Sequence, residues 1–335
     1  MKELFGTFLV VIMCNCSFLL GPDPENSPKN NFEIFWREFD QKYAYFQYSG
    51  VCWDSIYHVY RPMVNYQTSD SSLLNIFGEI ITALNDKHLM VFDINTFRGI
   101  NTGPFGSRTV KPSVHSYYLG VPQHSCSNRY ITYGKLLYNI GYMYVPSMNI
   151  RGISLKEWGE RIDHVLERLS DTQGLIVDIR DNHGGTSENA EALAARFVDS
   201  SIQYMKIRYR NGPRHDQFTE YQIRTVRPGG VPYRNRTVIL TDSATGSAAE
   251  WFTLAVRTAP HVVHGGYITA GAIGTTRTKR LPNRFDYTVT YGQAVALEDS
   301  TIQGRGIYPH VFFHRRSGVV DAFIEDAKRH IRLYL

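Results

Sequence analysis

The segment DSATGSAAEW, residues 242–251, places a serine, Ser247, between a predicted buried strand and a predicted helix. Open α/β sheets carry their functional residues at the carboxyl ends of their strands. A serine there lies beside backbone N–H groups at the positive end of the helix dipole, which can hold an oxyanion. Gly246 and Ala248 are small enough to let a substrate approach. The position fits two interpretations: a helix cap or a nucleophile for acyl transfer.

Two further motifs could act with this serine. The segment RDNHGG follows the apolar run LIVDIR, residues 175–180, and its Gly184 and Gly185 form either a plain tight turn or a loop that exposes N–H groups to a ligand. His88 lies directly between a predicted helix and a predicted strand, where a side chain can be fixed in place. It is either a general base or a partly buried histidine at a helix end.

The elements around these motifs predict an α/β core. Residues 175–180 and 237–243 are continuous apolar runs, typical of strands buried in a parallel sheet, and each precedes a predicted helix. Short strands with glycine turns follow, a closing helix begins at Asp321, and residues 95–115 are expected to form a loop. The core therefore needs crossover helices between parallel strands.

The region from Phe32 to Leu84 shows a helical period instead of strands. One apolar face recurs at i, i+3, i+4, i+7 and i+11, and Pro62 is expected to end or kink the second of three helices. The first face consists of Phe32, Phe35, Trp36, Phe39 and Tyr43. We expect a small helical subdomain whose aromatic side chains form its core.

Composition bounds the function and the location. The net charge of +5 is mild and the basic residues are dispersed, so no nucleic-acid partner is predicted. Residues 1–20 have a lysine near the start and an apolar run too short to span a membrane, as in a secretory signal peptide. The polar residues 21–30 are expected to form a flexible tether. We therefore expect an exported protein of the periplasm or cell envelope.

Two cysteines close the apolar run of the signal segment. Cys14 and Cys16 indicate lipoprotein processing with a lipid anchor, Cys16 being favoured, whereas Met13 and Asn15 argue against it because small residues are expected before such a cysteine. Both alternatives stay open. The remaining cysteines, Cys52 and Cys126, suggest neither a disulfide framework nor a metal site.

Together, five ordered segments resemble the S41 serine peptidases, the family of the C-terminal processing (tail-specific) proteases and the tricorn core. They are NDKHLMV, IGYMYVPSM, LIVDIRDNHGG, TDSATGSAAEW with GGYITAGAIG, and IQGRGIYPHV. The resemblance is to the tricorn-type branch, because Ala272 stands where the processing proteases carry a catalytic lysine. It implies a ClpP/crotonase-like α/β core with a mixed or parallel sheet, preceded by a helical subdomain. No PDZ domain fits between His88 and Tyr130, since roughly 40 residues are too few for one.

The resemblance also implies roles for individual residues. Ser247 would attack the scissile carbonyl, and His88 would take its proton and pass it to the leaving amine. The N–H groups of Gly185 and Ala248 would form the oxyanion hole. The fourth catalytic position, an acid in the family, is Gln303. Neither a metal nor another cofactor is implied.

Two departures from the family pattern affect the expected activity. Gln303 can orient the histidine but cannot stabilise an imidazolium as a carboxylate does, although Glu298 and Asp299 are near enough in sequence to substitute for the acid. Lys87 precedes His88 and would lower its pKa if the two groups are close.

The sequence thus predicts an exported serine endopeptidase that acts on peptides or unfolded proteins. Its organisation would be a signal peptide at 1–20, a tether at 21–30, the helical subdomain at 31–90 and the peptidase core at 91–335. The main alternative is a weak or inactive S41-like protein that binds peptides or apolar ligands. A crotonase-like enzyme acting on thioesters is disfavoured, because no adenine- or pantetheine-binding signature is present. The sequence leaves the substrate preference and the oligomeric state open.

Overall fold

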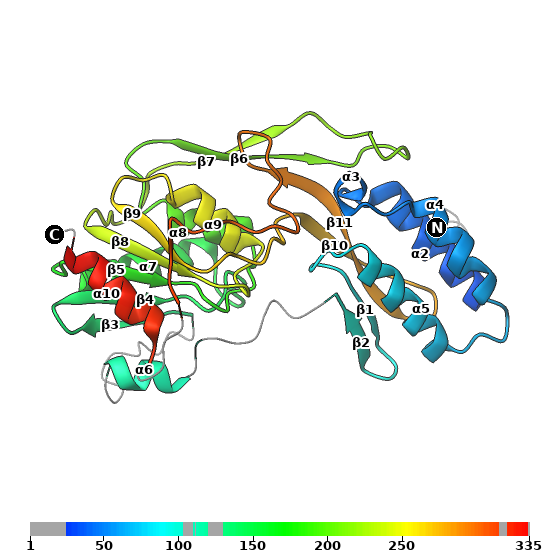
Figure 1. The fold of residues 1–335 in the computed structure, drawn as a ribbon, viewed down its shortest axis with the longest axis horizontal. Helices are drawn as coiled ribbons and strands as arrows, with labels where there is room; N and C mark the ends of the chain where they lie inside the picture. The colour runs from blue at the N-terminus through cyan, green and yellow to red at the C-terminus, as the bar shows by residue number, and fades with distance from the viewer. Residues whose placement is uncertain (1–24, 103–109, 111, 120–129, 315–319, 334–335) are drawn as a thin grey trace, which may run out of the picture.

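The computed structural model describes residues 25–102, 110, 112–119, 130–314 and 320–333. The predicted signal peptide with Cys14 and Cys16 lies outside these residues, as does Cys126. Figure 1 shows two lobes, with the N-terminal helices at one end and the C-terminal helix at the other. Within the described part of the chain, no helix is long and apolar enough to cross a membrane.

One lobe contains the predicted α/β core. Its six-stranded sheet has the order β12-β9-β8-β5-β4-β3, in which β3 and β4 are antiparallel and every other pair is parallel. The strands are β3 (Thr132–Leu136), β4 (Ile140–Tyr144), β5 (Gly174–Asp178), β8 (Arg236–Thr241), β9 (Val262–Gly266) and β12 (Val311–Phe312). The buried parallel strands predicted at residues 175–180 and 237–243 are confirmed as β5 and β8.

Helices cover both faces of this sheet because its strands are apolar on both sides. Along β5, Leu175 and Val177 pack into one core, whereas Ile176 packs into another on the opposite face. The first core is closed by α7 (Leu155–Arg168), α8 (Ser187–Ala194) and α9 (Ala248–Val256), and the second by α6 (Pro112–Leu119) and α10 (Ala322–Leu333). The sheet therefore presents the carboxyl ends of β5 and β8 side by side.

The second lobe is built on an antiparallel sheet, whose pairing the sequence pattern did not predict. Its order is β2-β1-β11-β6-β7, and β10 also pairs with β11. The strands are β1 (Met90–Asp93), β2 (Arg98–Asn101), β6 (Ile202–Tyr209), β7 (Gln222–Val226), β10 (Thr275–Arg280) and β11 (Phe285–Val295). The long strand β11 pairs with β1 at one end and with β6 at the other (Figure 1). At the β6 end, Met205 and Ala294 pack into the core of the α/β lobe, so this sheet connects the two lobes.

The N-terminal helices pack against this second sheet. They are α2 (Pro28–Lys42), α3 (Phe46–Ser49), α4 (Trp53–Tyr60), a 3-10 turn (Arg61–Met63) and α5 (Asp70–Ala83). Their aromatic core is confirmed, and it includes Phe285 and Tyr287 of β11. Pro62 lies in the 3-10 turn that ends α4, as expected. The region predicted as a helical subdomain thus shares its core with strands from the rest of the chain.

Two local predictions need correction. The helix α2 begins at Pro28, inside the predicted tether, because Ser27 caps it and proline suits the first helical position. Residues 95–115 are not all loop, since β2 pairs with β1 there and α6 begins at Pro112. The strand β2 is mostly exposed, so it lacks the apolar pattern that would have revealed it.

Candidate active site

Ser247 lies on a sharp turn between β8 and α9, immediately before the first helical residue. Its backbone has φ 56° and ψ −127°, a conformation that residues other than glycine rarely adopt. Its N–H donates to Ala272 O at 2.8 Å and to Glu250 Oε2 at 3.2 Å, which holds the turn in place. A strained strand-to-helix turn is the backbone feature that displays a nucleophilic serine above an α/β sheet. The Ser247 turn has this backbone feature.

Glu250 organises this turn from beneath, and the sequence interpretation gave it no role. The side chain is fully buried, and its oxygens accept hydrogen bonds from Thr269 Oγ1 (2.5 Å), Gly271 N (2.8 Å) and Ala272 N (2.9 Å) as well as from Ser247 N. Burial raises the pKa of Glu250, while these hydrogen bonds act in the opposite direction. The available signal was the S-x-x-E spacing of a capping box ahead of an apolar helix.

The glycine pair after β5 lies against the Ser247 turn. A Cβ on Gly184 would lie 2.6 Å from Ser247 Cβ, so only glycine permits this approach. Gly185 and Met148 form a parallel β-bridge, whose hydrogen bonds are made by the residues on either side of Gly185. Met148 N donates to Gly184 O, and Thr186 N donates to Met148 O. In this pattern the N–H of Gly185 itself points away from Met148.

Asn182 fixes the glycine loop in register with the serine turn. Its fully buried side chain donates to Val145 O at 2.9 Å and accepts from Gly184 N at 2.8 Å. Its backbone carbonyl accepts from Gly246 N at 3.0 Å. Ala248 is the first residue of α9, a position whose N–H has no partner within a helix. The N–H groups of Gly185 and Ala248 thus belong to two adjoining turns that hydrogen bonds hold together.

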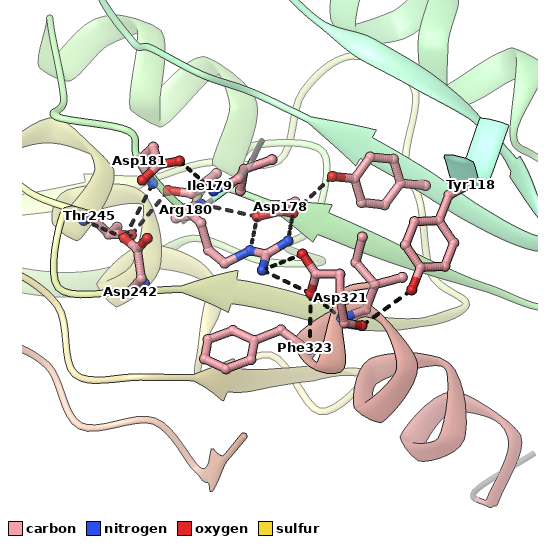
Figure 2. Close-up of polar contacts among 12 residues, drawn as sticks. Tyr118, Asp178, Ile179, Arg180, Asp181, Asp242, Thr245, Asp321 and Phe323 are labelled. Atoms are coloured by element: carbon pink, nitrogen blue, oxygen red, sulfur yellow. Dashed lines mark hydrogen bonds and ion pairs between the residues drawn. The ribbon is translucent and has the colours of Figure 1, made fainter. Parts of the chain in front are cut away.

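A buried ion cluster supports the start of the glycine loop (Figure 2). The Arg180 guanidinium lies between Asp178, at 2.6 Å, and Asp321 at the start of α10, at 2.9 Å. Burial acts to lower the pKa of Arg180, but the two carboxylates raise it well above its usual range. The next residue, Asp181, donates its N–H to Asp242 Oδ1 at 3.2 Å, which joins the loops after β5 and β8 (Figure 2).

We predict that Arg180→Met lowers the free energy of unfolding by about 3–5 kcal/mol, because it leaves two buried carboxylates without their counter-ion. Chemical denaturation monitored by circular dichroism measures this change. The control is Arg214→Met, which breaks the exposed Arg214–Asp216 pair and should cost less than about 1 kcal/mol. Equal effects of the two substitutions would contradict the role of the buried cluster.

His88 lies on the turn between α5 and β1, in the other lobe. Its side chain is 10% exposed, and Thr288 Oγ1 of β11 donates to its carbonyl at 2.6 Å. The same turn contacts the loop 269–273 through Lys87, whose Nζ donates to Ala270 O at 2.7 Å. The structure therefore joins the His88 turn and the Ser247 turn through the loop 269–273.

A carboxylate lies beside the imidazole, and it is Asp86. The ring nitrogen His88 Nδ1 is 3.8 Å from Asp86 Oδ1. The same oxygen accepts a hydrogen bond from the backbone N–H of His88 at 3.0 Å. Asp86 is buried, and its other oxygen accepts from Thr290 Oγ1 at 2.7 Å. Burial lowers the pKa of His88, and Asp86 opposes this effect. In the sequence, Asp86 belongs to the NDKHLMV motif, and its spacing of two residues from His88 was the available signal.

The acid substitutes proposed from the sequence lie elsewhere. Asp299 is 68% exposed and pairs with Lys206 at 2.7 Å, and Glu298 accepts from Ser300 at the surface. Gln303 is buried, and its Oε1 accepts from Ile273 N at 3.1 Å, so its side chain holds the end of the loop 269–273. Among the residues that the structure describes, no group of three or more His, Cys, Asp or Glu side chains could hold a metal ion.

Comparison with known proteins identifies related sequences and folds. The Tricorn protease C1 domain model matches residues 24–82. The carboxy-terminal processing protease CtpA of Bacillus subtilis (strain 168) is 28% identical over 174 residues. That alignment covers 52% of this chain and 34% of CtpA, so the chain spans about a third of the length of this curated relative.

Solved structures show the same fold over almost the whole chain. A candidate peptidase from Parabacteroides merdae ATCC 43184 superposes with a TM-score of 0.80 at 24% identity, covering 92% of this chain and 97% of that one. The photosystem II D1 C-terminal processing protease superposes with a TM-score of 0.57 at 15% identity, covering 91% and 97%. The Peptidase family S41 model matches residues 139–312. Because this match spans just over half of the chain, the protein belongs to peptidase family S41.

Proposed function

We propose that this chain is a serine endopeptidase in which Ser247 is the nucleophile and His88 the general base. The observation that carries the proposal is the strained backbone of Ser247, held beside Gly184 and Gly185 by a dedicated set of hydrogen bonds. Such strain persists only where the surrounding structure enforces it, and it gathers at functional sites. A plain helix cap needs no positive φ, because capping residues adopt extended backbone.

The chemistry follows from the two adjoining turns. Ser247 Oγ would attack the scissile carbonyl carbon while His88 accepts its proton, and the N–H groups of Gly185 and Ala248 would stabilise the negative oxygen of the tetrahedral intermediate. His88 would then return the proton to the leaving amine. Water would repeat the sequence on the acyl-enzyme, releasing the second product and restoring Ser247.

Asp86 would take over the supporting part that the family pattern assigns to an acid at position 303. Its carboxylate lies 3.8 Å from His88 Nδ1 and is fixed by Thr290, so it can orient the ring and favour the imidazolium that forms during attack. Gln303 would have a structural role, because its Oε1 accepts a hydrogen bond from Ile273 N. On this account the amide at position 303 is compatible with catalysis.

The pH profile is expected to reflect these environments. A general base works only when neutral, so kcat/KM should fall as the pH drops through the pKa of His88. Because burial lowers the pKa of His88, the midpoint of this acidic limb should lie below about 6.5, the value of an unperturbed histidine. Peptide cleavage measured between pH 4 and 9 gives this midpoint.

The Asp86→Asn variant provides the matched comparison. Asp86 raises the pKa of His88, so its loss should move the midpoint to still lower pH and reduce kcat. A midpoint that stays in place or moves to higher pH would contradict the pairing of Asp86 with His88.

Active-site labelling tests the proposal as a whole. The protein should react with a fluorophosphonate probe, and mass spectrometry of the labelled peptide should place the adduct on Ser247. Degradation of casein by the same preparation would establish endopeptidase activity. Intact, folded protein that takes no label and cleaves neither casein nor peptides would overturn the proposal in favour of a family member that only binds peptides or apolar ligands.

We also propose that the protein is exported and acts on peptides or unfolded proteins. The apolar segment at residues 1–20 supports export, and the family supports a peptide substrate. Mass spectrometry of the mature N-terminus would test this: a lipid on Cys16 or Cys14 indicates an anchored form, and cleavage without lipid indicates a free one.

A further inference from the structure

The two halves of the proposed catalytic pair belong to different hydrophobic cores. Leu84 and Leu89 flank the His88 turn and pack with the N-terminal helices and β11. Ala248 and Trp251 follow Ser247 and pack with the helices over the parallel sheet. The separation of Ser247 and His88 therefore depends on how these two cores are joined.

Lys87 makes a direct contact of this kind. Its Nζ donates to Ala270 O at 2.7 Å, from the residue that precedes His88. Ala270 N in turn donates to Thr245 O at 2.7 Å, two residues before Ser247. Two residues further along the same loop, Ala272 O accepts the Ser247 N–H at 2.8 Å. A short chain of hydrogen bonds thus runs from the His88 turn to the backbone of Ser247.

Two other hydrogen bonds of the His88 turn lead to its own lobe. Thr288 Oγ1 donates to His88 O and Thr290 Oγ1 donates to Asp86, and both threonines belong to β11. These bonds fix the turn on the antiparallel sheet. The loop 269–273, which packs against Glu250 beneath α9, continues into β10, and β10 pairs with β11. The Lys87 bond adds a direct side-chain contact between the turn and this loop.

We propose that Lys87 is a positioning residue that fixes the His88 turn against the loop 269–273, which in turn holds the backbone of Ser247. This inference rests on the function proposed above. The half-buried ammonium spans the two lobes with a charge-assisted hydrogen bond to a carbonyl, a strong type of contact. Proton transfer requires the base within hydrogen-bond reach of the nucleophile. Loosening the turn would therefore slow the chemical step and leave substrate binding nearly unchanged.

Kinetics of Lys87→Met and Lys87→Arg test this role. Methionine keeps the length and the apolar stem but cannot donate, so kcat should fall about 10- to 100-fold with KM changed less than about three-fold. Arginine keeps a donor and the charge, so its kcat should stay within about three-fold of wild type. Lys135→Met, which removes an exposed lysine paired with Asp171, should not alter kcat. A wild-type kcat for Lys87→Met, or an equal loss for Lys87→Arg, would overturn the proposal.

Hydrogen exchange separates this inference from the proposed function. In a Ser247→Ala background, which needs no activity, Lys87→Met should raise amide exchange in residues 86–89 and 269–273 by about ten-fold or more, and Lys87→Arg should not. Unchanged exchange in both segments would overturn the positioning role even if the enzyme is active. A different result is a wild type that does not react with the fluorophosphonate, while Lys87→Met still exchanges faster in these segments. That result would support the Lys87 contact between the lobes and would reject only the peptidase assignment.

Discussion

Replacing Ser247 with alanine is expected to lower peptide cleavage by roughly 10⁴- to 10⁶-fold, the range seen when a serine protease loses its nucleophile. The substitution removes the atom that attacks the carbonyl and leaves the N–H groups of the neighbouring turns in place. Fluorophosphonate labelling should disappear with the activity. Circular dichroism and the melting temperature should stay close to those of the wild type, because alanine keeps the Cβ that lies against Gly184 and the substitution removes only the hydroxyl of a partly exposed side chain.

A second substitution at the same position separates strain from chemistry. Ser247→Gly should be equally inactive but no less stable than wild type, because glycine relieves strain of roughly 1–3 kcal/mol at φ 56° and costs roughly 0.5–1 kcal/mol in backbone entropy. Denaturant titration measures the balance. A glycine variant less stable than Ser247→Ala would show that this backbone is not strained. Cleavage by either variant at the wild-type rate would show that Ser247 is not the nucleophile.

The second large effect is expected at Glu250. In Glu250→Gln, one oxygen becomes an NH₂ group that faces two of the present donors, so two hydrogen bonds are lost inside the core. At about 1–3 kcal/mol for each buried group left without a partner, the variant should lose about 2–6 kcal/mol of stability. Activity should fall at least about 100-fold, because the Ser247 turn and the loop 269–273 lose their common anchor.

The α7 helix offers a matched control for this prediction. Ser154 and Glu157 form the same S-x-x-E capping box, but Glu157 is exposed and accepts Ser154 N at 2.7 Å at the helix start. Glu157→Gln should cost less than about 1 kcal/mol and leave activity unchanged. Unfolding curves and peptide assays of both variants, made side by side, check the difference. Similar behaviour of the two glutamines would mean that Glu250 is merely a cap.

The parts of the site that depend on local sequence could be predicted. A buried strand, a turn with small residues and a helix specify the position of Ser247 and of Gly184–Gly185, because each motif forms within about ten residues of chain. The parallel order of β5 and β8 followed from their continuous apolar runs. His88 was a candidate base from its place between a helix and a strand, and the resemblance to the S41 peptidases joined it to Ser247.

The parts that depend on distant pairing could not be predicted. The antiparallel sheet brings β1 to β11 and β11 to β6, across segments whose alternation gives no partner or register. Asp86 matters because it lies beside His88 and accepts from Thr290 of β11, which only the folded chain shows. Glu250 was visible as a spacing, but its four donors come mostly from a loop some twenty residues away, between Thr269 and Ala272.

The hydrogen bond from Thr288 to His88 spans 200 residues of sequence, and this sets an order of events during synthesis. A nascent chain that has completed α5 and β1 carries its base, yet the turn has no β11 to hold it until residues 285–295 have been made. Ser247 likewise precedes the loop 269–273 that fixes its backbone. On the proposed mechanism, the growing polypeptide should therefore be unable to cleave peptides until β11 has been translated, and chains truncated before β11 should be inactive.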